Sequence, residues 1–256
     1  MPALARPRPL LALLACALCA ARLAGAAEPA ERSTPTAPEE GAEARAEERR
    51  RMVEEQIEAR GVRDPRVLEA LRRVPRHLFV PAERAADAYA DRAVPIGHGA
   101  TISQPYVVAV MTEQAAVRPG ARVLEVGTGS GYQAAVLAAL GAEVYTIEIV
   151  EALARQAEEN LRRAGAQQVH VRAGDGYRGW PEAAPFDAIL VTAAAPRVPE
   201  PLLAQLAVGG RLVIPVAASG GDQELQVHER TERGVEARRV LGVRFVPMTG
   251  EIRESR

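Results

Sequence analysis

The sequence contains no lysine, because all 32 of its basic residues are arginine. This absence excludes a Schiff-base lysine, the phosphate-binding lysine of a P-loop and the Tyr/Lys pair of a dehydrogenase. Cysteine is nearly as scarce: Cys16 and Cys19 are the only two, and both lie in an apolar run near the N-terminus. Their C-x-x-C spacing is that of a redox motif, but two small residues of a leader explain it better. The rest of the chain has no thiol for a disulfide or a metal site.

An excess of positive charge is also missing, since 33 acidic residues balance the arginines and the net charge is −1. We therefore predict no nucleic-acid partner. The four histidines are scattered without ligand spacing, so we predict no metal site. The apolar share of 48% is that of an ordinary globular protein.

The first 26 residues have the features of a secretory leader. Arginines precede the apolar stretch Leu10–Ala21, and small residues follow at positions 24–26. The stretch is too short for a comfortable membrane span, so we predict no membrane association. The alternative is an upstream extension ahead of a start at Met52.

Residues 27–47 are rich in Pro, Glu, Ala, Ser and Thr, which predicts a disordered linker before a folded domain over 48–256. Within that domain, strand patterns alternate with helical ones. This alternation predicts an α/β fold with a doubly wound, mostly parallel sheet. We expect helices at 46–60, 66–73, 82–91, 107–117, 151–164 and 199–207, and strands at 123–126, 143–148, 168–172, 186–192, 210–216, 224–230 and 235–246, with a short extended piece at 77–81.

A glycine-rich turn follows the first of these strands. Gly127, Gly129 and Gly131 stand at alternate positions between the strand and a helical pattern over 132–140. Glycine lets the backbone turn sharply and approach a ligand closely, and the helix start then directs free N–H groups at it. The next strand ends in Glu148, about twenty residues beyond the turn, where a ribose hydroxyl acceptor is expected. We therefore predict an adenosine-type cofactor; the alternative is a purely structural turn, with Glu148 capping the next helix.

A long loop with little periodicity spans Val94 to Tyr106, and loops of this length in compact domains are usually functional. It contains the segment Thr101-Ile-Ser-Gln-Pro105. Ser103 stands two residues before Pro105, a spacing typical of a helix N-cap. A purely structural role for Ser103 would therefore be to cap the helix that follows.

Several motifs together resemble those of protein-L-isoaspartate O-methyltransferases. They are Thr101–Pro105, Met111–Glu113, Val123–Gly131, Gly174–Tyr177 and Val246–Thr249, and the similarity extends from about Arg50 to Thr249. The glycine turn is general to S-adenosylmethionine-dependent methyltransferases, whereas the Thr-Ile-Ser-Gln-Pro loop is specific to this family.

The resemblance implies a Rossmann-like seven-stranded sheet with N-terminal helices and a substrate loop. It implies methylation of the free α-carboxylate of L-isoaspartyl residues in damaged proteins, with S-adenosyl-L-methionine as cofactor, and repair through a succinimide. Ser103 corresponds to the family's active-site serine. The implied cofactor-binding residues are Thr101, Ile102, Glu125, Gly127, Gly129, Gly131, Glu148, Asp175, Gly176 and Thr249.

The chemistry agrees with this assignment, because a carboxylate with a pKa near ~4 is already ionised and needs no general base. Catalysis then consists mainly of aligning the reacting atoms, and the neutral hydroxyl of Ser103 can orient one carboxylate oxygen. Glu125 would face the methionine amino group or hold the glycine turn through backbone N–H groups. Asp175 would accept from the adenine amine, or else bond its own turn.

A glycine-rich turn also occurs in proteins of four other kinds: a methyltransferase acting on another substrate, a nicotinamide-dependent oxidoreductase, a nucleic-acid methyltransferase and a non-catalytic cofactor-binding module. The oxidoreductase would need G-x-G-x-x-G, and a base methyltransferase an Asn/Asp-Pro-Pro-aromatic motif where Thr192–Arg197 stands. We expect isoaspartyl-containing proteins as partners and a monomer. The family and the cytosolic cofactor favour the cytoplasm; a working leader would place the enzyme in the periplasm.

Overall fold

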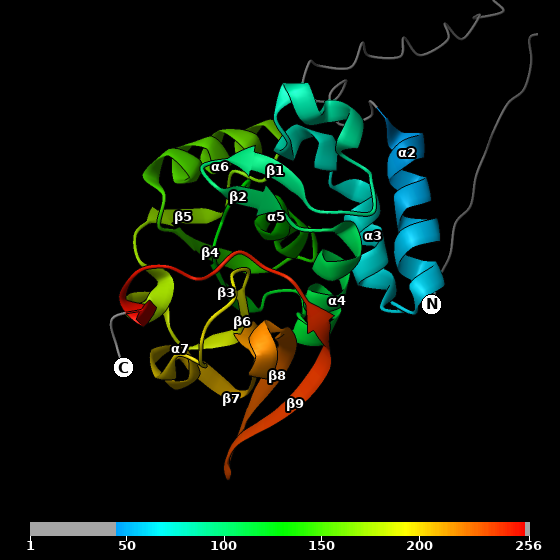
Figure 1. The fold of residues 1–256 in the computed structure, drawn as a ribbon. Helices are drawn as coiled ribbons and strands as arrows, with labels where there is room; N and C mark the ends of the chain where they lie inside the picture. Colours follow the sequence, from blue (N-terminus) through cyan, green and yellow to red (C-terminus); the bar gives the residue numbers. More distant parts are fainter. Residues whose placement is uncertain (1–44, 254–256) are drawn as a thin grey trace, which may run out of the picture. The chain divides into compact units, whose positions relative to one another are not determined.

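The computed structural model describes residues 45–253, so the predicted leader and most of the predicted linker lie outside the described residues. A seven-stranded sheet crosses the described part of the chain in the order β5-β4-β3-β6-β7-β8-β9 (Figure 1). Its strands are β3 (Arg122–Val126), β4 (Glu143–Glu148), β5 (His170–Ala173), β6 (Phe186–Val191), β7 (Leu206–Ala217), β8 (Gln223–Thr231) and β9 (Gly234–Val243). The predicted α/β fold with a seven-stranded sheet is confirmed.

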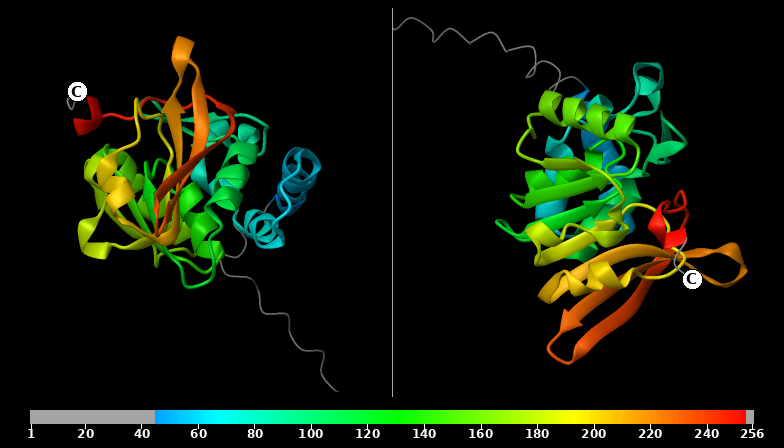
Figure 2. Two further views of the ribbon diagram at one scale, coloured as in Figure 1. Left: turned by 90° about the horizontal axis from the view of Figure 1, so that it is seen from below. Right: turned by 90° about the vertical axis from the view of Figure 1, so that its left-hand side faces the viewer.

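The first five strands of this sheet are parallel, and the last two pair antiparallel. From β3 the chain proceeds to β4 and β5 on one side, then returns to β6 on the other side of β3. The strand order therefore reverses between β3 and β6, and a crevice is expected beyond their carboxyl ends. Figure 2 shows β8 and β9 as a long twisted hairpin at one edge.

The sheet separates two apolar cores, because adjacent residues of a strand point to opposite faces. Val123 of β3 belongs to one core and its neighbour Leu124 to the other. The larger core packs the sheet against three helices, α4 (Pro105–Ala115), α5 (Tyr132–Ala139) and α6 (Glu151–Arg163), and against the N-terminal helical layer. The smaller core lies under the short helix α7 (Glu200–Ala204) and the C-terminal segment.

The N-terminal layer begins with one continuous helical stretch, α2 (Ala46–Arg51), a π-helical turn (Met52–Ile57) and a 3₁₀ turn (Glu58–Arg60). It ends at Gly61, as predicted, with a φ of +100° that favours glycine. The next helix, α3 (Pro65–Arg73), starts as the sequence predicts, because the Asp64 side chain accepts from the Arg66 backbone N–H at 2.9 Å.

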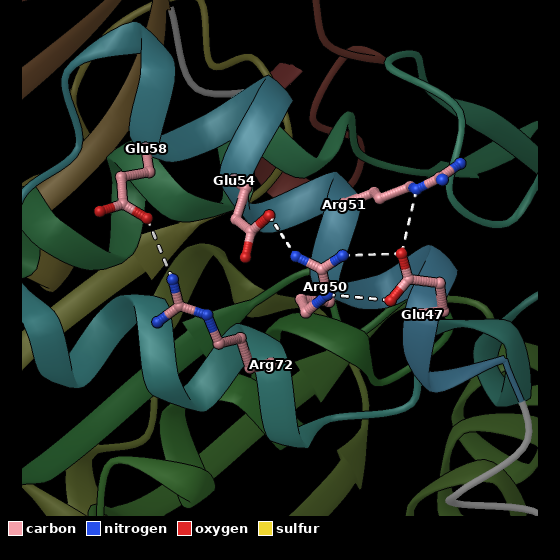
Figure 3. Close-up of polar contacts among 6 residues, drawn as sticks. All are labelled: Glu47, Arg50, Arg51, Glu54, Glu58 and Arg72. Carbon is pink, nitrogen blue, oxygen red and sulfur yellow. Dashed lines mark hydrogen bonds and ion pairs between the residues drawn. The ribbon is translucent and has the colours of Figure 1, made fainter.

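Arginine alone supplies the cations of the ion pairs on this layer (Figure 3). Arg50 reaches Glu47 on one side and Glu54 on the other, and Arg72 of α3 joins Glu58 at 3.0 Å. The guanidinium fork lets one cation bind two carboxylates. Because these side chains are largely exposed, each pair contributes little by itself, and apolar packing carries the stability of the layer.

Three local predictions are wrong. The piece predicted as extended at 77–81 is a 3₁₀ turn (Arg76–Phe79), since prolines at 75 and 81 bracket a stretch that buries Phe79. The helix predicted at 82–91 is a 3₁₀ segment that ends at Asp87. The loop predicted between Val94 and Tyr106 contains an antiparallel hairpin of β1 (Val94–Gly97) and β2 (Ala100–Ile102).

Positive φ angles at the tip explain why that hairpin escaped prediction. Gly97, His98 and Gly99 have φ values of +93°, +52° and +74°, so three successive residues adopt the left-handed region. This turn folds a stretch without strand alternation back on itself. A smaller difference concerns α7, which is shorter than predicted because Leu206 already belongs to the long strand β7.

Candidate active site

A cavity of about 340 Å³ opens at the carboxyl ends of β3 and β6. Its walls come from the glycine turn after β3, the end of β4, the β1–β2 hairpin and the segment after β9. We call it the inner cavity; its polar and glycine lining includes Thr101, Ser103, Glu125, Gly127, Thr128, Gly129, Ser130, Gln133, Glu148, Gly176, Thr192 and Thr249.

Gly127 is held between two strands at the mouth of this cavity. Its backbone N–H donates to the Ile147 carbonyl at 2.8 Å, and its carbonyl accepts from the Thr192 hydroxyl at 2.6 Å. Its φ is +101°, and a Cβ on this residue would lie 2.5 Å from the Thr192 side-chain oxygen. Glycine is thus required by both conformation and space, and the backbone stays open to a ligand.

Glu148 ends β4 and supports the same turn. Its Oε2 accepts from the Gly129 N–H at 2.8 Å, and its Oε1 accepts from the Val150 N–H at 3.0 Å. Each carboxylate oxygen has a further lone pair, so Glu148 can still accept bonds from a diol in the cavity. Glu148 does not cap α6, because the N-cap residue Val150 makes no side-chain cap bond; the bond to Oε1 lies in the turn that precedes the helix.

Glu125 lies inside β3 with no exposed surface. Its Oε2 accepts from the Thr146 hydroxyl at 2.6 Å, and that hydroxyl also pairs with Thr128 at 2.6 Å. Its Oε1 is buried without a hydrogen-bond partner among the described residues. Burial raises the pKa of Glu125 to about 8; the Thr146 hydrogen bond opposes this shift and the charge of Glu148 adds to it. Glu148, rather than Glu125, binds the N–H of the glycine turn.

Asp175 follows β5, and each of its carboxylate oxygens accepts one backbone hydrogen bond. Its Oδ1 accepts from the Tyr177 N–H at 2.9 Å, and its Oδ2 accepts from the Glu251 N–H at 2.7 Å. The turn-aspartate interpretation accounts for the bond from Tyr177 but not for the bond from Glu251, which lies on the C-terminal segment, and the contact with adenine stays a prediction. The neighbouring Gly176 does line the inner cavity, and a Cβ there would lie 2.4 Å from a methyl carbon of Val126.

Ser103 stands where the inner cavity meets a second depression. This outer groove, of about 670 Å³, runs between Arg60 and Tyr106 on one side and the β8–β9 end on the other. Four residues line both hollows: Thr101, Ser103, Thr192 and Val246. Helix α4 is capped by Gln104 without a side-chain bond, so the N-cap interpretation of Ser103 is wrong.

The C-terminal segment closes one side of this site. After β9 the chain returns across the carboxyl edge of the sheet (Figure 1), where Ala194 donates to the Val246 carbonyl at 2.9 Å and accepts from the Met248 N–H at 2.7 Å. These bonds bring Thr249 to the inner cavity. Thr249 was expected near the end of the last strand, but it lies six residues beyond β9.

The structure thus brings the predicted site residues to one place, except that Gly131 and Asp175 do not line the inner cavity. Gly131 is instead the N-cap residue of α5, where a Cβ would lie 3.1 Å from Leu161. Sequence reasoning missed Thr192, although the carboxyl-end rule for open sheets singles out the residue after β6. It also missed the threonine pair at 128 and 146.

Between residues 45 and 253 there is no cluster of three or more potential metal ligands and no helix able to cross a membrane.

Comparison with known proteins decides the family. The family model described as protein-L-isoaspartate(D-aspartate) O-methyltransferase matches residues 47–253. The chain belongs to this family. A protein-L-isoaspartate O-methyltransferase of Gloeobacter violaceus is 57% identical over 200 residues, which cover 78% of this chain and 98% of that one. One of Methanoregula boonei is 55% identical over 207 residues, or 81% and 95% of the two chains.

Solved structures of the family share the fold. One protein-L-isoaspartate O-methyltransferase has a TM-score of 0.73 at 29% identity and covers 79% of this chain and 67% of its own. Another, from Plasmodium falciparum in complex with S-adenosyl-L-homocysteine, has a TM-score of 0.70 at 27% identity and covers 78% and 98%. The predictions of family, enzyme class and cofactor are confirmed: this member methylates isoaspartyl residues and uses S-adenosyl-L-methionine.

Proposed function

We propose that Ser103 orients the isoaspartyl carboxylate at the junction of the two hollows, with the methyl donor in the inner cavity and the damaged peptide in the outer groove. The single observation that carries this proposal is that Ser103 lines both. A carboxylate held there faces the cavity while its main chain stays outside. The hydroxyl donates one hydrogen bond and takes no proton, since the acceptor is already ionised.

The residues that line the inner cavity fit S-adenosylmethionine. The cofactor supplies an activated methyl group on a sulfonium; the chain supplies the cradle. Gly127 and Gly176 leave space that a Cβ would fill, and Glu148 keeps lone pairs for ribose hydroxyls. The unpartnered Oε1 of Glu125 offers a buried acceptor for the methionine ammonium group. Thr101, Ile102, Gly129, Asp175 and Thr249 are proposed contacts on the evidence of the family motifs.

The outer groove fits an extended polypeptide. Strand β9 is the edge strand of the sheet, and its end forms one wall. On the other wall, the Arg60 guanidinium stacks 3.6 Å from the Tyr106 ring centroid and pairs with Asp91 at 3.2 Å. An open groove with one edge strand accepts main chain of any sequence, which suits an enzyme that must act on many damaged proteins.

The test is methylation of an isoaspartyl peptide by Ser103→Ala at saturating S-adenosylmethionine. We expect kcat to fall about 100-fold while the Kd for S-adenosylhomocysteine stays within about threefold. The matched control is Thr231→Ala, which removes a hydroxyl at the far end of β8. Wild-type turnover by Ser103→Ala would refute the assignment.

We further propose that the enzyme is a monomer that acts in the cytoplasm, where its cofactor is made. The alternative is a periplasmic enzyme exported by residues 1–26. Sedimentation of the purified protein tests the first point. N-terminal sequencing of the natural protein tests the second: a first residue near Ala27 would indicate export, and one near Met52 would support the cytoplasm.

A further inference from the structure

Arg76 is an arginine with no exposed surface, and it is the largest fully buried side chain in the described part of the protein. It is the first residue of the 3₁₀ turn Arg76–Phe79, most of which was predicted to be extended. Its hydrogen bonds go to two carbonyls, and among residues 45–253 only tyrosines, no carboxylates, interact electrostatically with it. Burial lowers its pKa to about 10, so the guanidinium is still charged at neutral pH.

The guanidinium joins three parts of the site. Its Nη2 donates to the Ser103 carbonyl at 2.7 Å, and its Nε donates to the Ala88 carbonyl at 2.7 Å. Its central carbon lies 4.8 Å from the centroid of the Tyr132 ring, and Tyr132 is the first residue of α5 and lines the inner cavity. Arg76 itself lines neither hollow.

A buried cation without an acidic partner is costly, and an apolar side chain of similar volume would usually stabilise a core as well or better. Simple packing therefore does not explain the charge. What the planar fork provides is geometry: two carbonyls from separate segments are held by one rigid group, while its face rests on the helix that begins at the glycine turn. One of those carbonyls belongs to the residue at the junction of the two hollows.

We propose that Arg76 is a positioning residue for methyl transfer, and that it holds the Ser103 backbone so that the Ser103 hydroxyl meets the acceptor carboxylate. This inference rests on the proposed role of Ser103. Arg76 touches neither substrate nor cofactor. It acts through the carbonyl of Ser103. Through its contact with Tyr132, it also fixes the position of the loop that carries Ser103 relative to the cofactor cavity. Misplacement of a reacting group by about 1 Å is enough to slow a reaction about 100-fold.

The test uses Arg76→Lys and Arg76→Met, with Arg230→Met as the matched control. Arg230 also donates to two carbonyls, those of Ala204 and Leu206, and it lines neither hollow. We expect both Arg76 variants to lower kcat at least about 10-fold, with the Kd for S-adenosylhomocysteine within about threefold. Lysine keeps the charge but cannot span both carbonyls, so it does not restore kcat. Arg230→Met keeps kcat within about threefold.

A double-mutant cycle separates positioning from general stability. In a Ser103→Ala background, Arg76→Lys should lower kcat by less than about twofold, because the hydroxyl that it positions is gone. Full additivity would overturn the inference, and so would wild-type kcat in Arg76→Lys or loss of cooperative unfolding in both Arg76 variants. If Ser103→Ala itself keeps wild-type kcat, the proposed role of Ser103 fails first, and the role of Arg76 with it.

Discussion

The side-chain oxygen of Thr192 occupies the space that a Cβ on residue 127 would need, at 2.5 Å. The same hydroxyl donates to the Gly127 carbonyl at 2.6 Å, so the turn after β3 is fastened to the end of β6. These two strands flank the point where the strand order reverses. The cofactor cradle is therefore fixed from both sides of the crevice.

Gly127→Ala is expected to damage this cradle. The new methyl group must displace Thr192 or the turn, and alanine is strained at a φ of +101°. We expect the Kd for S-adenosylhomocysteine, measured by calorimetry, to rise at least about 10-fold. Gly120→Ala is the matched control, since Gly120 has a φ of +78° with nothing within 4 Å. Equal Kd values for the two variants would show that the contact with Thr192 is irrelevant.

Glu125 should make the stability of the free enzyme fall as pH rises. Its pKa is raised from 4.5 to about 8, so between these values the unfolded carboxyl loses its proton while the folded one keeps it. The folded state then binds more protons, and the free energy of unfolding decreases through this window. The Glu125→Gln side chain stays neutral and does not contribute to this loss. From pH 5 to pH 8, the free energy of unfolding of wild type should therefore fall by about 2 kcal/mol or more relative to that of Glu125→Gln.

Chemical denaturation across that pH range measures the difference. If the difference in unfolding free energy between Glu125→Gln and wild type stays constant with pH, the raised pKa of Glu125 is contradicted. Proton release on binding gives an independent check: a cationic ammonium group beside Glu125 favours its ionised form, so binding at pH 7 should release up to about one proton. Calorimetry in buffers of different ionisation enthalpy reports this release, and Glu125→Gln should abolish it.

Glu148→Ala should weaken cofactor binding for two reasons. It removes the acceptor of the Gly129 N–H and the proposed acceptor for the ribose hydroxyls. We expect the Kd for S-adenosylhomocysteine to rise about 10-fold to 100-fold. Glu151→Ala, three residues along the chain and exposed on α6, serves as the control and should bind normally. Wild-type affinity of Glu148→Ala would remove this residue from the cofactor site.

The sequence predicted the parts of the fold that local rules determine. Apolar strand patterns that alternate with helical ones located all seven strands of the sheet, and the Asp64-Pro65 pair located the start of α3. The glycine turn was placed correctly because its spacing between strand and helix is a local property. Family motifs brought Ser103 and Thr249 into the same expected site, although nearly 150 residues of chain separate them.

What escaped prediction depends on contacts distant in sequence. No local pattern marks Arg76 as buried, and only the folded chain shows that its guanidinium donates to the carbonyls of Ala88 and Ser103. The hydroxyl of Thr192 acquires its role from the turn 65 residues earlier. The outer groove likewise joins Tyr106 to the end of β9, which no local pattern connects.

A crystal structure of the enzyme with S-adenosylhomocysteine and an isoaspartyl peptide would show whether Ser103 holds the acceptor carboxylate. We expect the cofactor product in the inner cavity and the peptide main chain in the outer groove. We expect a peptide carboxylate oxygen within about 3 Å of the Ser103 hydroxyl. A carboxylate bound away from Ser103, or a peptide that lies outside the groove between Tyr106 and β9, would contradict this arrangement.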